Sequence, residues 1–280
     1  MLSRFLSTLV LWTVIIGSLW FFGAHGAVVL LTLLSALTLY EFYGLTAKMG
    51  ARPFRWMGLG FSLLITAAPY GLAYFSDESD LIAGLPAGLL VLALIICCVR
   101  VLRERDATNR VETIASTMIG LLYVPYMLHY LVAILMRDGP DGDNLMLCMW
   151  TVAVSKFCDV GALFTGLAIG KHKMSPTISS KKTWEGAVGG VLVSAGVGAG
   201  FAWFASGHLP LTMTPLVAAL IAVPLALITI VSDLIESVIK RRADTKDTGA
   251  LIPGIGGAFD LTDSLILTAP VAYFIFQFLD

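Results

Sequence analysis

The chain has 280 residues and a formal net charge of −1, and 58% of its residues are hydrophobic while only 13% are charged. Soluble domains average about 45–50% apolar and about 25% charged residues, so the composition excludes a water-soluble enzyme, a disordered chain and a secreted disulfide scaffold. A near-zero net charge offers no general attraction to nucleic acid, and we expect no such partner. The class that remains is a polytopic membrane protein.

Nine apolar runs are long enough to cross a membrane, at about 20 residues for each crossing. They lack the alternation of barrel strands, so we expect membrane-spanning helices and an all-α fold. The first two runs are separated by a few residues around His25 and Gly26, which predicts a tight helical hairpin. The predicted spans cover residues 5–23, 27–44, 57–75, 81–99, 114–136, 145–169, 187–206, 215–235 and 261–279.

The positions of the basic residues agree with this number of spans. With nine spans drawn, 16 of the 18 lysines and arginines fall on one side of the membrane, and only Arg137 falls in a loop on the other side. Cytoplasmic loops carry the excess of lysine and arginine, so this side is predicted to face the cytoplasm. We therefore expect a bacterial inner-membrane protein with a cytoplasmic N-terminus and an extracytoplasmic C-terminus.

The two parts of the chain differ in where their charges lie. Residues 1–136 form five predicted N-terminal spans with almost no ionisable groups. Residues 137–280 form four predicted spans with charges at the membrane ends and cytoplasmic loops at 170–186 and 236–260. We predict that the second part is the catalytic region.

The sixth run contains a pair of opposite charges, Lys156 and Asp159. Residues three apart share a helix face, and charged groups within a membrane usually face the bundle interior or a wet cavity. Two interpretations stay open, namely a structural ion pair and the wall of a polar cavity that opens to the cytoplasm.

The loop at 170–186 combines basic residues with hydroxyl groups. Lys181 and Lys182 stand between Ser179 and Thr183, followed by Trp184. Lysines at the membrane surface attract anionic lipids, and lysines beside hydroxyl groups also suit the binding of phosphate. The mixture of residue types favours a phosphate-binding loop.

Three carboxylates are predicted to meet at one depth of the membrane. Asp233 lies near the cytoplasmic end of the eighth run, while Asp260 and Asp263 share a face at the start of the ninth. Carboxylates of this kind are ligands for Mg²⁺, which usually takes one or two of them together with substrate phosphates. Asp260 alone could be a helix N-cap, but bases and glycines within the same stretch favour a nucleotide site.

The stretch from Ser237 to Asp263 resembles the signature of the phosphatidate cytidylyltransferase family, S-x-x-K-R-x₄-K-D-x-G-x₃-P-G-H-G-G-x₂-D-R-x-D. Upstream, Ser179–Gly186 and Gly170–His172 resemble two further elements of that family, and the likeness covers about residues 159–264. The chain departs from the pattern at Ser180, Ile255 and Leu261, where the family usually has Pro, His and Arg. The matching positions are Ser237, Lys240, Arg241, Lys246, Asp247, Gly249, Pro253, Gly254, Gly256, Gly257, Asp260 and Asp263.

The resemblance implies an enzyme of phospholipid biosynthesis that converts CTP and phosphatidate to CDP-diacylglycerol and pyrophosphate. It implies Mg²⁺, as one or two ions, with Asp233, Asp260 and Asp263 as ligands, and Lys182 and Asp247 as further catalytic residues. CTP, a lipid phosphate and membrane lipids are the expected partners, and a homodimer stays open. The expected substrate-binding residues are Asp159, Ser179, Lys181, Thr183, Ser237, Lys240, Arg241, Lys246, Gly256 and Gly257.

Two alternatives accompany this expectation. The first is a related lipid kinase, or a cytidylyltransferase that acts on another lipid phosphate. The second is a transporter, with Lys156 and Asp159 lining its path. A transporter should carry charges near the middle of several spans, whereas here they lie mostly at the cytoplasmic ends, which favours chemistry at the membrane surface.

Overall fold

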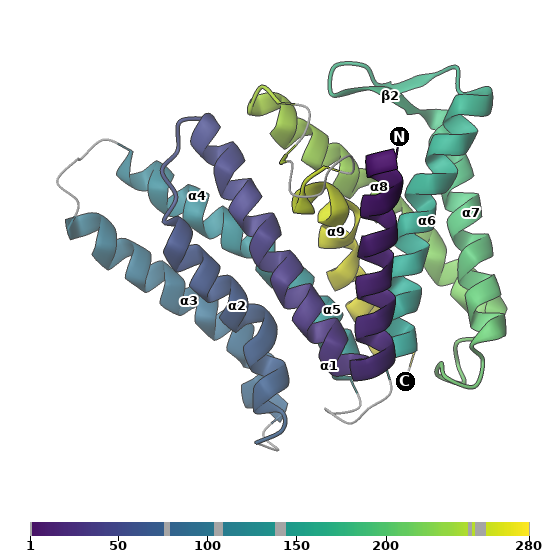
Figure 1. Cartoon of the computed structure of the whole chain (residues 1–280), viewed down its shortest axis with the longest axis horizontal. Helices are drawn as coiled ribbons and strands as arrows, with labels where there is room; N and C mark the ends of the chain where they lie inside the picture. Colours follow the sequence, from purple (N-terminus) through teal and green to yellow (C-terminus); the bar gives the residue numbers. More distant parts are fainter. Residues whose placement is uncertain are drawn as a thin grey trace. The chain divides into compact units, whose positions relative to one another are not determined.

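A computed structural model of the chain describes residues 2–75, 79–103, 109–137, 144–245, 248–249 and 256–279. The structure consists of helices and one short β-hairpin (Figure 1). The elements are α1 (Leu2–Lys48), α2 (Arg55–Leu72), α3 (Ser79–Arg103), α4 (Arg110–Tyr123), α5 (Pro125–Leu135), α6 (Leu145–Ile169), β1 (Lys173–Ser175), β2 (Ser179–Thr183), α7 (Trp184–Phe204), α8 (Pro215–Arg242) and α9 (Ala258–Gln277).

The helical membrane fold predicted from composition is confirmed. Seven helical stretches in the described part of the chain are long and apolar enough to cross a membrane. The predicted count of nine is not confirmed, because the first two predicted spans lie within α1 and because α2 is not among the seven. Many large apolar side chains are exposed, as expected for a surface that faces lipid.

The helical hairpin predicted near the N-terminus is present as a sharp reversal within α1. Gly23 has φ 53° and ψ −130°, a backbone conformation outside the helical region and in a range of φ that favours glycine. Figure 1 shows the two arms of α1 running in opposite directions from this reversal. The turn therefore lies just before His25 and Gly26.

The chain forms two units, which we describe separately. The first comprises residues 1–141 and 242–262. Its core contains Phe42, Tyr123 and Phe259, and the Phe259 ring centroid lies 6.0 Å from that of Phe42 and 6.2 Å from that of Tyr123. The Tyr43 hydroxyl donates to the Thr117 carbonyl oxygen at 2.9 Å, which ties α1 to α4. Aromatic packing and hydrogen bonds between helices thus hold this unit together.

The second unit comprises residues 142–241 and 263–280. Trp150 of α6 donates its indole N–H to the Gly198 carbonyl oxygen of α7 at 3.0 Å. The Thr229 hydroxyl lies 3.1 Å from the Ser155 hydroxyl and 3.0 Å from the Thr268 hydroxyl. This chain of hydroxyls joins α6, α8 and α9, as hydrogen bonds between helices do where water is excluded.

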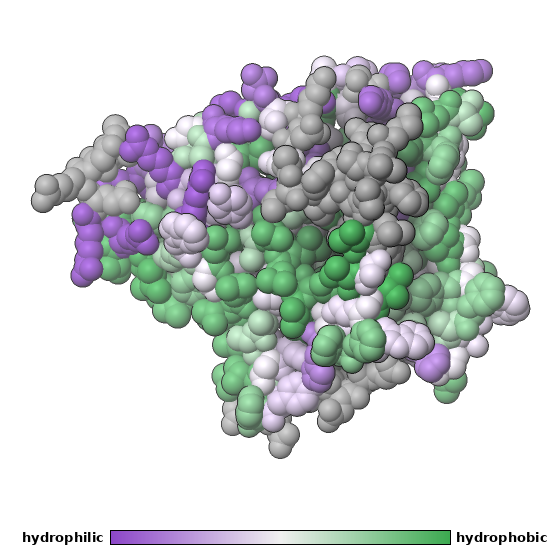
Figure 2. Space-filling view, viewed as in Figure 1, coloured by the Kyte–Doolittle hydropathy of each residue, from purple (hydrophilic) through white to green (hydrophobic). Residues whose placement is uncertain are grey.

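The β-hairpin lies between α6 and α7 in the second unit. Its two strands are antiparallel, with Lys173 opposite Thr183 and Ser175 opposite Ser179. Figure 2 shows hydrophilic residues over this hairpin and a largely hydrophobic surface on the α7 side below it. The hairpin thus lies at a polar end of the unit, where a membrane helix meets water.

Candidate active site

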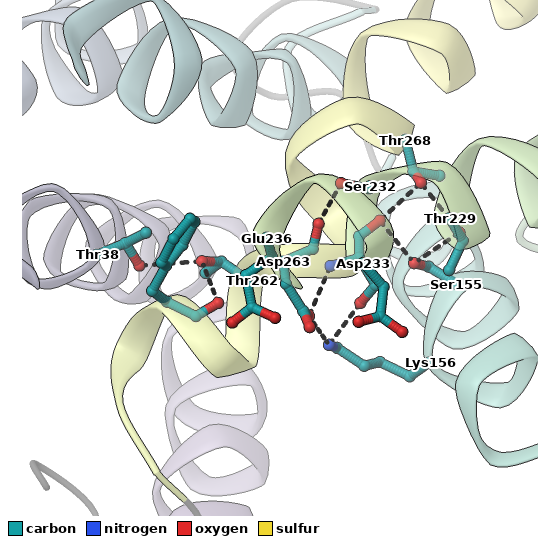
Figure 3. A network of polar contacts seen from close by, with 12 residues as sticks. Thr38, Ser155, Lys156, Thr229, Ser232, Asp233, Glu236, Thr262, Asp263 and Thr268 are labelled. Carbon is teal, nitrogen blue, oxygen red and sulfur yellow. Dashed lines mark hydrogen bonds and ion pairs between the residues drawn. The ribbon is translucent and has the colours of Figure 1, made fainter. Parts of the chain in front are cut away.

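Three carboxylates come together in the second unit. Asp233 and Glu236 project from α8, and Asp263 projects from the part of α9 that belongs to this unit (Figure 3). One oxygen of each group lies within 4.8 Å of an oxygen of the other two. Asp233 and Glu236 are three residues apart and share a face of α8, which explains why both reach the same point.

Each of these carboxylates is paired with a lysine. Lys182 Nζ lies 2.7 Å from Asp233 Oδ2, and Lys240 Nζ lies 2.8 Å from Glu236 Oε1. Lys156 Nζ completes the set at 3.6 Å from Asp263 Oδ1. We call these six residues the acid–lysine cluster. Its charges balance, and this balance is what allows the Glu236 side chain to be only 2% exposed.

Lys156 and Asp159, whose role the sequence leaves open, lie close to the three carboxylates. The Lys156 ammonium group donates to the Ser264 hydroxyl at 2.6 Å and pairs with Asp263, so it links α6 to α9 (Figure 3). Asp159, one turn further along α6, is half-buried and within electrostatic reach of Lys156, Asp233 and Asp263. The two residues thus lie beside the carboxylates, and both interpretations of the pair stay predictions.

Polar contacts join the segment around the hairpin to its neighbours. The Glu185 carboxylate accepts hydrogen bonds from the backbone N–H groups of Lys171 and His172, at 3.1 Å and 3.2 Å to its Oε2. The His172 ring Nδ1 lies 2.5 Å from Glu185 Oε1. Arg241 donates from Nε to the Ile178 carbonyl oxygen at 3.3 Å, which connects the end of α8 to the hairpin turn. The loop predicted to bind phosphate is therefore held over the end of α8.

Four of the predicted substrate-binding residues, three in the hairpin and one on α8, differ in their surroundings. Thr183 is buried, and its hydroxyl accepts a hydrogen bond from the Gly186 N–H at 3.1 Å as the N-cap of α7. Lys181 is exposed on β2. Ser179 begins that strand, and Ser237 is half-buried on α8. Substrate binding by these four residues stays a prediction.

The start of α9 lies in the first unit, and there Asp260 has its own partners. Its Oδ2 accepts a hydrogen bond from the Gly257 N–H at 2.7 Å and one from the Thr248 hydroxyl at 2.9 Å. Gly256 has φ 129°, which favours glycine, and directly precedes Gly257. A metal-ligand role for Asp260 stays a prediction. The predicted residues Lys246 and Asp247 lie outside the described residues.

The sequence predicts that Asp233 and Asp263 share one site, but it does not identify Glu236 as a member. The signal that could have found it is the spacing of three from Asp233 at the end of an apolar run. A second acidic side chain, Glu41 of α1, was also missed, although the apolar run 27–44 holds no other charged residue. Glu41 is buried in the first unit.

A polytopic membrane protein with carboxylates and lysines gathered at a polar end is equipped to bind phosphate groups and a divalent cation. The chain matches the cytidylyltransferase family over residues 2–279, and it belongs to that family.

Curated relatives with the same printed name, phosphatidate cytidylyltransferase, cover most of the chain. The protein from Synechocystis sp. is 28% identical over 284 residues, which span 91% of this chain and 88% of the relative. That from Thermotoga maritima is 28% identical over 255 residues, with 90% and 88% covered. That from Rickettsia bellii is 32% identical over 190 residues, with 67% and 80% covered.

Proposed function

We propose that this chain transfers the cytidylyl group of CTP to phosphatidate, which yields CDP-diacylglycerol and pyrophosphate for phospholipid synthesis. The observation that carries the proposal is the acid–lysine cluster at a polar end of a membrane unit, in a chain that belongs to the cytidylyltransferase family. The name shared by relatives that cover about nine-tenths of the chain supports phosphatidate as the lipid.

The reaction is a displacement at phosphorus. An oxygen of the phosphatidate phosphate attacks the α-phosphorus of CTP, the bond from that phosphorus to the bridging oxygen breaks, and pyrophosphate leaves with the bonding electrons. Both reactants are anions, so the barrier is largely electrostatic. The substrate supplies the nucleophile, and the protein needs no activated serine or cysteine.

The lysines of the cluster supply positive charge where the two anions meet. Lys182 and Lys240 are only partly exposed, at 20% and 16% of the side chain, so their charges are less screened than those of surface lysines. We propose that their ammonium groups hold phosphate oxygens of CTP and of the leaving pyrophosphate. Lys181, which is exposed on β2, and Arg241 would contribute to binding of the same anions.

The residues present also fit a divalent cation. Hard oxygen ligands within 4.8 Å of one another match the preference of Mg²⁺ for carboxylates and phosphates. We propose Asp233, Glu236 and Asp263 as the ligands, with Asp260 kept as a further candidate. When bound, the cation would neutralise negative charge on the phosphates. If a cation took up these carboxylates, Lys182 and Lys240 would be available to phosphate oxygens.

The orientation in the membrane belongs to the same proposal. CTP is a cytoplasmic metabolite, and the hairpin carries Lys173, Lys181 and Lys182 at the polar end of the second unit. Positive residues at that end support a cytoplasmic hairpin in a bacterial inner membrane.

The experiment that tests the proposal uses the purified full-length protein in detergent with labelled CTP and a panel of lipid phosphates. We expect a CDP-linked lipid from phosphatidate, no product with EDTA present, and recovery on addition of Mg²⁺. Glu236→Gln should raise the Mg²⁺ concentration needed for half-maximal activity, because one ligand loses its charge. Product from a polyprenyl phosphate alone would contradict phosphatidate as substrate, and unchanged activity in EDTA would contradict the metal.

A further inference from the structure

A buried carboxylate in the first unit lies outside the site described above. Glu41 is only 5% exposed, and it is the only Asp, Glu, Lys or Arg within the first five predicted spans. Placing an ionisable group in a membrane helix costs free energy, unless neighbouring groups compensate its charge. Glu41 lies on the second arm of α1, close to its end at Lys48.

The partners of Glu41 are at the start of α9. Its Oε2 accepts a hydrogen bond from the Phe259 N–H at 2.9 Å and one from the Thr248 hydroxyl at 3.1 Å. Helix α9 begins at Ala258, so the Phe259 N–H is one of the first four that lack an acceptor within the helix. Glu41 therefore caps α9 from a helix more than 200 residues away in the sequence, as the separation of 218 for this pair shows.

The glycine before α9 is what makes this cap possible. Gly257 stands at the position where a serine, threonine or aspartate usually caps a helix with its own side chain. A Cβ atom on Gly257 would overlap Glu41 Oε2 and would also lie too close to the Thr248 hydroxyl oxygen, so these two side chains together occupy the space of the missing side chain. Asp260 supplies the other half of a capping box by accepting the Gly257 N–H at 2.7 Å.

Thr248 ties the two carboxylates together. Its hydroxyl contacts Glu41 Oε2 at 3.1 Å and Asp260 Oδ2 at 2.9 Å, and a hydroxyl has one proton to share between them. The next residue, Gly249, also packs directly on Glu41, because a Cβ there would overlap Glu41 Oε1. Both described ends of the glycine-rich stretch of the family signature thus rest on one side chain of α1.

We propose that Glu41 is a positioning residue for cytidylyl transfer, which holds the two described ends of the glycine-rich stretch and sets the orientation of Asp260. The inference rests on the proposed function, because Asp260 is one of the carboxylates offered for that reaction. Glu41 acts through Thr248, Gly257 and the first turn of α9, and it needs no contact with substrate. A negative group at this helix end is also favoured by the helix dipole.

The test compares four proteins, namely wild type, Glu41→Ala, Gly257→Ser and the double variant. Glu41→Ala should lower kcat by about 10- to 100-fold with a smaller change in KM for CTP, since a small misplacement of reacting groups costs mainly kcat. Gly257→Ser should be harmful in wild type, where its side chain meets the carboxylate. In the Glu41→Ala background the same serine should raise kcat, because it restores a cap in the space that the carboxylate leaves, where only the Thr248 hydroxyl has to turn aside.

Two controls separate positioning from general damage. Glu112→Ala removes an exposed carboxylate of the same unit and should leave kcat and the melting temperature unchanged. Glu41→Gln keeps an acceptor oxygen and should retain more activity than Glu41→Ala. A Glu41→Ala protein that loses melting temperature but keeps its kcat would overturn the proposal, as would equal effects of Gly257→Ser in both backgrounds.

The melting temperatures of the same four proteins keep this test apart from that of the proposed function. If wild type makes no CDP-linked lipid, the proposed function fails. The reversal of the Gly257→Ser effect in melting temperature would still support the contact of Glu41 with α9, and its absence would overturn that contact as well.

Discussion

Lys181 and Lys182 are neighbours in β2 with opposite surroundings. Lys182 pairs with Asp233 at 2.7 Å, whereas Lys181 is exposed. Successive side chains of a strand point to opposite faces, so only one of two adjacent lysines can face the carboxylates. The sequence identified the pair as phosphate-binding, but their difference needed the strand, which short runs of Ser, Lys and Thr do not reveal.

We predict that Lys182→Met lowers kcat by about 100- to 1,000-fold, the scale seen when one electrostatic donor is removed from an active site. Lys181→Met should lower activity less than about tenfold, mainly through KM for CTP, because its charge is solvated. Steady-state kinetics of the two purified variants provide the measurement. Equal losses in both would contradict the assignment of Lys182 to the cluster.

The acidic residues differ in how far their positions in the site follow from the sequence. Asp233 and Asp263 could be predicted, because each lies at one end of an apolar run, and Asp263 also lies within the signature-like stretch. Glu236 and Glu41 could not be assigned in the same way. The spacing of three places Glu236 on the same face of α8 as Asp233, but which face of α8 is buried, and which helix lies beside the start of α9, are results of tertiary packing.

At the scale of elements, Thr183 joins the hairpin to α7. The sequence placed it among the substrate-binding residues, but its hydroxyl accepts the Gly186 N–H as the N-cap of α7. The pattern Thr-x-x-Gly before an apolar run carries a capping signal as well as a phosphate signal, and the sequence alone does not separate them.

We expect Thr183→Ala to cost about 1 kcal/mol of stability through loss of the cap, while Thr183→Ser retains most of it. Melting temperatures of the detergent-solubilised variants would measure this effect. KM for CTP should stay close to that of wild type in both variants. An increase in KM without a fall in melting temperature would contradict the capping role and favour direct substrate binding.

At the scale of the whole molecule, the predicted division into residues 1–136 and a catalytic region at 137–280 stays a prediction. The predicted boundary at residues 136 and 137 lies close to the one at 141 and 142. Residues 242–262, however, belong to the first unit, although they were expected within the catalytic region. The contacts of Thr248 and Phe259 with Glu41 explain this membership, and such long-range contacts leave no periodic trace in the sequence.

The predicted orientation can be tested within the second unit. In a variant without the native cysteines, a cysteine at the exposed Thr177 of the hairpin should react only after cells are permeabilised. A cysteine at the exposed Ser206, beyond the other end of α7, should react with a membrane-impermeant maleimide in intact cells. The opposite pattern would contradict the positive-inside assignment.

The central claim is that this chain transfers a cytidylyl group. The most direct test follows which phosphate of CTP enters the lipid product. The purified protein is incubated with phosphatidate, Mg²⁺ and CTP labelled either at the α- or at the γ-phosphate. We predict that the α-label enters the organic-soluble lipid, that the γ-label appears in pyrophosphate in equal amount, and that Asp263→Asn shows neither. Entry of the γ-label into lipid would reveal a kinase, and that result would contradict the account.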